Sequence, residues 1–254
     1  MAERAFVIEG ETLISEALDA GIGLEAVFVS EEHHDLPVLR QAEAGGHRVH
    51  QLASGVLERV AGTVTPQPVL AIARALDVAL DSVRQAPLVV VCVDVRDPGN
   101  AGSILRSAEA SGAGAVVFCA GSVDVFNPKT VRSSAGSLFH VPVVSGGDPV
   151  AVLETLGHWG FCRLATVARG GRPYDELDYD VPVAVVLGNE AHGLPTATGP
   201  TGPTGLDAHV DQRVTIPMAG RAESLNVGMA AALICFEALR QRRARPSNAT
   251  RTLS

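Results

Sequence analysis

The chain has 254 residues, of which 46% are hydrophobic and 4% aromatic, enough to bury one large core or two smaller ones. Charged residues occur within the opening MAERAF, and the longest apolar run, LVVVCVDV, has only the length of a strand, so we expect neither a signal peptide nor a membrane span. With 20 basic and 28 acidic residues, the net charge of −8 argues against nucleic-acid binding through the overall field of the protein. The deficit lies in the first 84 residues, where 6 basic and 13 acidic residues give −7.

The first 84 residues predict a small α/β unit. ETLISEALDAG, PVLRQAEAGG and SGVLERVAGT favour helices, whereas AVFVS and HRVHQL have the length and composition of strands. The run VLAIARAL from Val69 is apolar enough for either a buried strand or a buried helix. The segment DSVRQAP, which ends at Pro87, marks the boundary that we expect with the next domain.

From Leu88 the pattern changes to near-continuous apolar strands, namely LVVVCVDV, AVVFCAG, FCRLATVA and VAVVLG, and RVTIPM follows later as another. Strands without polar alternation are usually buried on both faces. We therefore predict an α/β fold in which helices cover both faces of a mostly parallel sheet.

Two further segments complete the chain. Residues 196–211 are rich in glycine, proline and threonine and predict a flexible loop. The stretch AESLNVGMAAALICFEALRQRRAR predicts a long helix that ends before Pro246, and we expect residues 246–254 to be a disordered tail. Apolar residues lie on one side of this helix: Leu225, Met229, Leu233 and Phe236.

The cysteines are far apart among aliphatic residues and lack both CxxC spacing and a nearby histidine. We interpret them as buried free thiols of a cytoplasmic protein, without a metal site. They are Cys92, Cys119, Cys162 and Cys235.

Polar residues follow predicted strands at the edge where open α/β sheets hold their ligands. In DVRDPGNAGSILRSAEASG a helix begins near Asn100, which could cap it, and Arg106 projects from its second turn. In VVLGNEAHGLP, Glu190 follows a buried strand, and Gly188 and Gly193 permit close backbone approach or positive φ. Each residue alone also has a simple structural role, as a cap, a surface charge or part of a turn.

The third polar segment is IPMAGRAESLNVGMAAAL. Ser224 and Asn226 lie in the opening turns of the last helix, where free N–H groups collect. Ser224 alone could be an ordinary hydroxyl at a helix N-terminus. The small residues from Gly228 to Ala232 indicate close helix packing.

Together these three ordered segments resemble the three motifs of the SpoU-type RNA 2′-O-ribose methyltransferases of the SPOUT superfamily. The resemblance covers Leu88 to about Arg243. In addition, FVIEGETLISEAL resembles the small, ribosomal-protein-like substrate-binding domain that often precedes them. The resemblance thus implies an RNA-binding domain at residues 1–84 and a methyltransferase domain at residues 88–245.

The resemblance implies S-adenosylmethionine-dependent methylation of an RNA ribose, with ribosomal RNA favoured by the N-terminal module. It also implies a homodimer whose sheet threads a deep trefoil knot, a feature that no periodicity predicts. The implied cofactor site consists of Leu187, Gly188, Asn189, Ile216, Met218, Ser224 and Leu225. The implied catalytic set is Arg106 with Asn100, Glu190, Ser224 and Asn226.

Two roles are open for Arg106. An arginine normally stays charged, so it either accepts the proton of the 2′-hydroxyl in a special environment or holds the adjacent phosphate and stabilises the developing alkoxide. Because the N-terminal domain is acidic, either RNA contact uses a local set of arginines, or substrate binding is weak or needs a partner. The candidates are Arg96, Arg132, Arg169, Arg172 and the RQRRAR segment.

Three alternatives remain at the level of sequence. The substrate could be transfer RNA, or the chain could be a non-catalytic RNA-binding or assembly protein that retains the fold. A dinucleotide-dependent oxidoreductase is disfavoured, because GAGAVVF precedes a strand instead of opening a helix after one, and no GxGxxG occurs.

Overall fold

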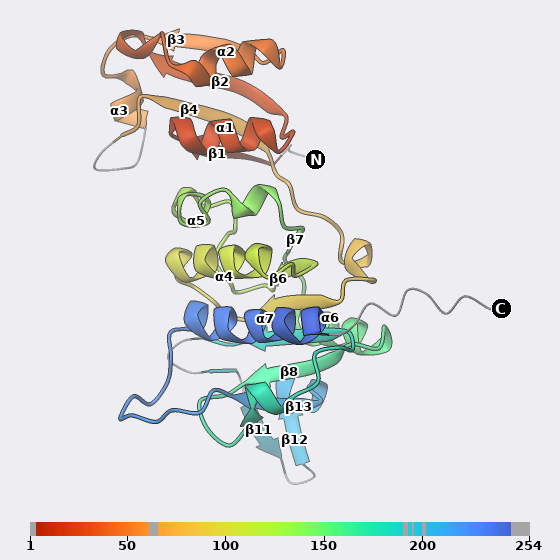
Figure 1. Cartoon of the computed structure of the whole chain (residues 1–254). Helices are drawn as coiled ribbons and strands as arrows, with labels where there is room; N and C mark the ends of the chain where they lie inside the picture. The colour runs from red at the N-terminus through yellow and green to blue at the C-terminus, as the bar shows by residue number, and fades with distance from the viewer. Residues whose placement is uncertain (1–3, 61–65, 190–192, 195, 200–201, 245–254) are drawn as a thin grey trace, which may run out of the picture.

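The computed structural model describes residues 4–60, 66–189, 193–194, 196–199 and 202–244. Two sheets form the body of the molecule, a small one near the N-terminus and a large one below it (Figure 1). Within the described residues, no helix is both long and apolar enough to cross a membrane. The expected tail at residues 246–254 lies outside the described part of the chain.

The N-terminal unit is a four-stranded sheet with the strand order β1-β4-β2-β3. VLAIARAL forms the inner strand β4, which pairs antiparallel with β1 and β2, so the open choice between strand and helix is settled in favour of strand. The strands are β1 (Ala5–Glu9), β2 (Leu24–Ser30), β3 (Val49–Leu52) and β4 (Val69–Arg74). The helices are α1 (Glu11–Asp19), α2 (Pro37–Ala44) and α3 (Val56–Val60).

The large sheet has seven strands in the order β7-β6-β5-β10-β8-β13-β9, and every pairing is parallel. This confirms the predicted parallel α/β sheet. Three short elements, β7, β9 and the helix α5 (Pro128–Ser133), have no counterpart in the sequence-based prediction. The strands are β5 (Leu88–Cys92), β6 (Ala115–Phe118), β7 (Val143–Ser145), β8 (Cys162–Thr166), β9 (Arg172–Pro173), β10 (Val183–Leu187) and β13 (Gln212–Thr215).

Successive residues of the central strands enter two different apolar clusters, as a sheet covered on both faces requires. Val90 and Val185 pack with α4 (Pro98–Ala110), α5 (Pro128–Ser133) and α7 (Val227–Ala244), whereas Val91 and Val186 pack with α6 (Pro149–His158). The valine-rich runs are therefore uninterrupted by polar residues, because side chains on both faces of these strands are buried.

The small unit packs directly on the large one. Phe6 of β1 packs against Phe126 with the two rings tilted by 34° and their centroids 4.9 Å apart, and both rings are buried. Beside them the carboxylate of Glu9, only 8% exposed, accepts a hydrogen bond from Arg132 of α5 at 2.5 Å. One apolar cluster runs through both units, so a division of the chain at residues 84–88 stays a prediction.

Residues 196–211 differ from the flexible loop that was expected. The segments Thr196–Gly199 (β11) and Gly202–Gly205 (β12) form an antiparallel hairpin, which a short 3-10 helix, Leu206–His209, follows. Leu206 is 6% exposed and belongs to the apolar cluster of α6. This apolar anchor explains why a segment with loop-like composition is folded.

Candidate functional site

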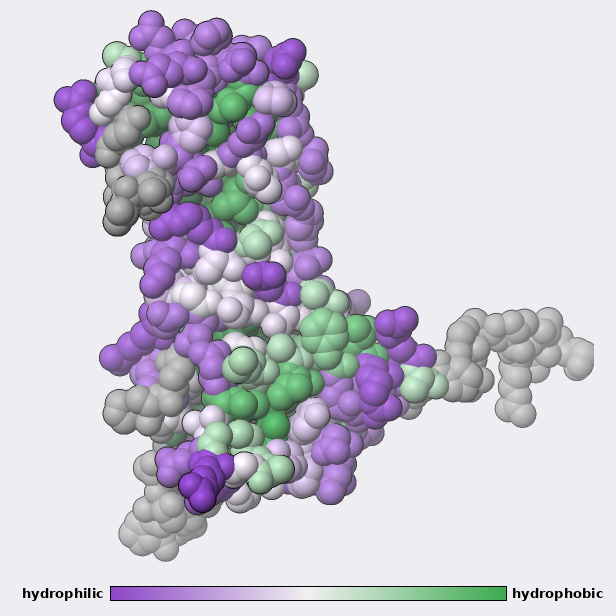
Figure 2. All heavy atoms as spheres, turned by 60° about the vertical axis from the view of Figure 1, so that its left-hand side comes forward, coloured by the Kyte–Doolittle hydropathy of each residue, from purple (hydrophilic) through white to green (hydrophobic). Residues whose placement is uncertain are grey.

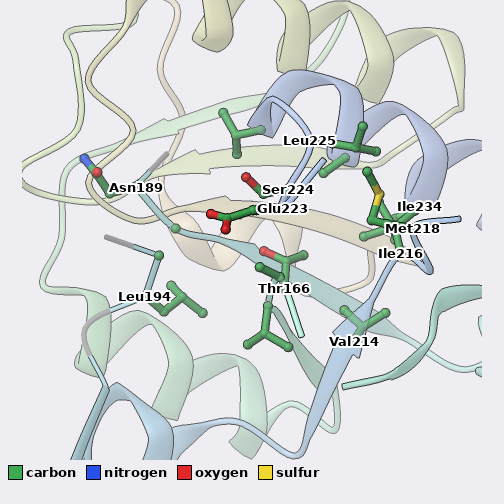
Figure 3. A pocket seen from close by; sticks show the side chains of 16 residues that line it. Thr166, Asn189, Leu194, Val214, Ile216, Met218, Glu223, Ser224, Leu225 and Ile234 are labelled. Atoms are coloured by element: carbon green, nitrogen blue, oxygen red, sulfur yellow. The ribbon is translucent and has the colours of Figure 1, made fainter. Parts of the chain in front are cut away.

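Strands β5, β10, β8 and β13 are neighbours that run parallel, so their carboxyl ends meet at one edge of the sheet. The segments that follow three of these strands enclose a cavity of about 460 Å³ (Figure 3). Small-molecule sites typically measure about 300–1,000 Å³. The described lining comprises residues 166–168, Gly188, Asn189, Gly193, Leu194, Val214, Ile216, Met218, residues 223–225, Val227, Ala230 and Ile234.

Most of the predicted cofactor residues line this one cavity. Leu187 is the exception, because it is completely buried at the end of β10 and is not among the lining residues. The six that line it are Gly188, Asn189, Ile216, Met218, Ser224 and Leu225. Segments that are distant in the sequence thus converge as the motif pattern predicts.

The two glycines after β10 have different structural roles. A Cβ on Gly188 would lie 2.5 Å from the backbone of Gly193 and Leu194, so glycine is required where the loop returns against itself. Gly193 has φ +67, the left-handed conformation that glycine adopts easily. Close ligand approach is therefore not needed to explain Gly188.

Asn189 holds the loop after β10 against the loop after β5. Its side-chain N–H group donates to the backbone carbonyl of Asp94 at 3.0 Å and to the Asp94 carboxylate at 3.2 Å. Asp94 itself has φ 57, an uncommon conformation for a residue with a side chain. The left-handed turn at Asp94 thus fixes the edge of the sheet beside the cavity.

Asn226 joins two of the predicted catalytic segments. Its side-chain N–H group donates to Oδ1 of Asn100 at 2.7 Å, while its own Oδ1 accepts from the backbone N–H groups of Gly228 at 2.9 Å and Met229 at 3.3 Å. Asn226 is thus the cap of α7, which begins one residue later. The helix was expected to begin earlier, around Ala222.

The cap of α4 also differs from the expectation. Asp97 accepts the backbone N–H of Asn100 at 2.8 Å and is the N-cap, so Asn100 lies inside the first turn. The Asn100 side chain is consequently available to Asn226. Sequence alone assigned the capping role to the wrong member of DPGN, because both residue types favour that position.

Of the remaining catalytic candidates that the model describes, Ser224 lines the cavity and Arg106 does not. Arg106 is exposed on α4, does not line the cavity, and makes no hydrogen bond or ion pair among the described residues. Glu190 lies outside the described residues.

Several of the arginines that are candidates for RNA contact have partners within the chain. Arg96 bonds Asp94 at 2.6 Å, and Arg132 bonds the buried Glu9. In the RQRRAR segment, Arg240 pairs with Glu237, and Arg242 donates to backbone carbonyls of Tyr179 and Pro87. Arg169 and Arg243 are exposed and have no such bond among the residues that the model describes.

Two polar residues of the cavity, Thr166 and Glu223, were not identified from the sequence. Thr166 ends β8 and donates to the carbonyl of Val186 at 3.0 Å, and Glu223 precedes Ser224. The position of Thr166 at the end of a predicted strand was the available signal for it. For Glu223 the signal was its position within the third polar segment.

Comparison with known proteins identifies the family of the chain. The model of the SpoU rRNA Methylase family matches residues 87–236, which is more than half of the chain. The chain belongs to the SpoU rRNA methylase family. A second family model, the MRM3-like substrate binding domain, matches residues 1–71, which include β1 to β3 and the beginning of β4.

This SpoU protein is similar to its relatives over most of its length. It is 34% identical over 91% of the chain to a 23S rRNA (guanosine(2553)-2′-O)-methyltransferase, RlmP of Bacillus subtilis, and covers 87% of that protein. The structure of the SpoU methyltransferase AviRb from Streptomyces viridochromogenes in complex with AdoMet matches with a TM-score of 0.79 at 30% identity, covering 94% of this chain and 91% of that one. An AdoMet-bound rRNA methyltransferase from Sinorhizobium meliloti matches with a TM-score of 0.77 at 30% identity, covering 96% and 89%.

Proposed function

We propose that this SpoU protein transfers the methyl group of S-adenosylmethionine to the 2′-hydroxyl of a ribose in ribosomal RNA. The observation that carries the proposal is the cavity at the carboxyl edge of the parallel sheet, next to the Asn100–Asn226 hydrogen bond. Relatives whose names specify 23S rRNA 2′-O-methylation support the substrate class. The match of residues 1–71 to a substrate-binding domain supports the same assignment.

The cavity suits this cofactor chemically. Its aliphatic side, with Ile216, Met218 and Ile234, fits an adenine ring, and the hydroxyls of Thr166 and Ser224 provide polar contacts at the other side (Figure 3). When bound, the cofactor supplies an electrophilic methyl group on a sulfonium. The residues of the chain hold it close to the nucleophile and in line with it, which supplies a large part of the rate enhancement in group transfer.

We assign the role of phosphate clamp to Arg106. A guanidinium binds a phosphate through two parallel hydrogen bonds and stabilises the charge that develops as the 2′-hydroxyl loses its proton. Asn100, Glu190, Ser224 and Asn226 form the polar shell around the reacting ribose in this proposal. Arg106 is exposed and does not line the cavity of its own chain, and in this proposal it acts across a subunit boundary.

A homodimer is therefore part of the proposal. Three large apolar side chains on one side of α7 are exposed, Met229 by 60%, Leu233 by 39% and Phe236 by 47%, although the sequence alone would place such residues in a core. An apolar area is visible on the lower half of the molecule in Figure 2. A second copy that covers α7 would bury this stripe. We expect Phe236→Asp to convert a dimer into a monomer in light-scattering measurements, and an unchanged mass would contradict the use of α7.

The trefoil knot and the cytoplasmic location belong to the same proposal and are supported by family membership. The substrate class is tested by incubating the full chain with labelled S-adenosylmethionine and separate fractions of ribosomal and transfer RNA. We expect label in ribosomal RNA alone. Label in transfer RNA alone would contradict the proposed substrate and identify transfer RNA as the substrate instead. Calorimetry that detects no cofactor binding would favour the non-catalytic alternative.

A further inference from the structure

The part of the cavity lining that the model describes contains one charged side chain. Among the sixteen described residues that line it, Glu223 is the only one with an ionisable side chain. Its carboxylate points into the cavity beside Ser224, on the side away from Met218 and Ile234 (Figure 3). The remaining lining residues are aliphatic, glycine, threonine, serine or asparagine, and none of them can neutralise a carboxylate.

No cation of the described chain compensates this charge. Glu223 makes no ion pair or side-chain hydrogen bond with any residue that the model describes, and Arg221, two positions earlier, is exposed and makes none with it. The carboxylate of Asp94, which accepts a hydrogen bond from the lining residue Asn189, is paired with Arg96. The charged side chain of the described lining is thus negative and favours a positively charged group of a ligand.

We propose that Glu223 is a specificity-determining residue that selects the charged methyl donor over the demethylated product. The inference rests on the proposed function. S-adenosylmethionine carries a sulfonium, an ammonium and a carboxylate, for a net charge of +1. In the transfer the S–CH₃ bond breaks and its electron pair stays on sulfur, the O–CH₃ bond forms, and the hydroxyl proton leaves. The product, S-adenosylhomocysteine, is therefore neutral overall and lacks the sulfonium.

The position of Glu223 identifies the sulfonium, which the product lacks, as its partner. Glu223 lies three residues before Asn226, which bonds Asn100, so its carboxylate is at the polar side of the cavity. The aliphatic side around Ile216 and Met218 suits the adenine. The methyl group must lie close to the polar residues that receive the ribose, and the sulfonium is bonded to it. A carboxylate there weakens the binding of the product relative to the donor and limits product inhibition.

The site is partly open to water, which weakens the interaction between Glu223 and the sulfonium but leaves it large enough to measure. Two unit charges about 4 Å apart interact by about 1 kcal/mol in water and about 4 kcal/mol at an effective dielectric constant near 20, and exposure places Glu223 toward the lower value. We expect Glu223→Gln to lower the affinity for S-adenosylmethionine by about tenfold, equivalent to about 1.4 kcal/mol. The affinity for S-adenosylhomocysteine should change by less than about threefold.

The experiment is titration calorimetry of the full chain with three probes: S-adenosylmethionine, S-adenosylhomocysteine and sinefungin, in which a protonated amine on carbon replaces the methylsulfonium. Glu43→Gln, an exposed glutamate in α2, is the matched control and should leave all three affinities unchanged. Thermal unfolding of Glu223→Gln checks that the variant is folded. Selective weakening of the two cationic probes supports the proposal.

Equal weakening of all three probes would overturn the proposal, because the carboxylate would then face the ammonium that they share. Three unchanged affinities would overturn it as well. A wild-type chain that binds none of the probes would instead refute the proposed function. A second readout is product inhibition during RNA methylation: the ratio of the inhibition constant for S-adenosylhomocysteine to the KM for the donor should fall in Glu223→Gln.

Discussion

Asn226 serves two purposes through different atoms, and substitutions can separate them. Its Oδ1 caps α7 by accepting backbone N–H groups, and its side-chain N–H group bonds Asn100 at 2.7 Å. Asn226→Asp keeps an oxygen acceptor for the cap but removes the donor to Asn100. Asn226→Ala removes both, so the pair of variants distinguishes helix capping from the arrangement of the site.

The magnitudes follow from the contacts. Loss of an N-cap costs about 1 kcal/mol, and loss of an exposed side-chain hydrogen bond costs about 0.5 kcal/mol, so Asn226→Ala should lower the free energy of unfolding by about 1.5 kcal/mol. In Asn226→Asp the carboxylate gains about 0.5 kcal/mol from the helix N-terminus, which offsets its contact with the Asn100 oxygen. Its stability should stay within about 0.5 kcal/mol of wild type.

Activity should behave differently from stability. If the Asn226 N–H group orients Asn100 toward the ribose, both variants should lose at least about tenfold in methyl transfer, the equivalent of one hydrogen bond of about 1.4 kcal/mol. Urea unfolding and transfer of labelled methyl to RNA measure the two quantities. Full activity in a stable Asn226→Asp would refute the idea that the Asn226–Asn100 bond serves catalysis.

Two further predictions concern stability, measured by urea unfolding. Glu9→Gln should lower the free energy of unfolding by about 1–2 kcal/mol, because the carboxylate of Glu9, 8% exposed, binds the partly exposed Arg132 of α5 across the contact between the two units. A change as small as that caused by Glu43→Gln would mean that the pair contributes nothing to stability. Tyr179→Phe should raise the free energy of unfolding by up to about 1 kcal/mol, because the buried hydroxyl of Tyr179 has no hydrogen-bond partner among the described residues. The same burial raises the pKa of Tyr179. A loss of stability would contradict this prediction.

The extent to which the sequence predicted the fold has a physical basis. Runs such as that of β5 were predicted because residues buried on both faces leave no polar positions. Short elements such as β7 and α5 carry too few residues to show a period. The hairpin of β11 and β12 was missed because its composition is typical of loops, whereas the side chain that anchors the segment, Leu206, follows it.

The site was predictable in outline and not in its contacts. Strand ends carry polar residues, so the converging segments could be found from their order along the chain. The bond between Asn100 and Asn226 joins positions 126 residues apart, and no local pattern encodes it. Likewise, glycine is needed at position 188 because a Cβ there would lie 2.5 Å from the backbone of Gly193 and Leu194. This contact exists only in the folded loop, so the sequence does not show it.

The most direct test of the central claim is the mapping of methyl groups that the chain transfers from labelled S-adenosylmethionine to ribosomal RNA. The wild-type protein should label a ribose 2′-oxygen. Arg106→Ala should retain cofactor binding in calorimetry and lose at least about 100-fold in transfer, and Arg106→Lys should recover only a small part, because an ammonium lacks the planar fork that fits a phosphate. Label on a base, or normal transfer by Arg106→Ala, would contradict the account.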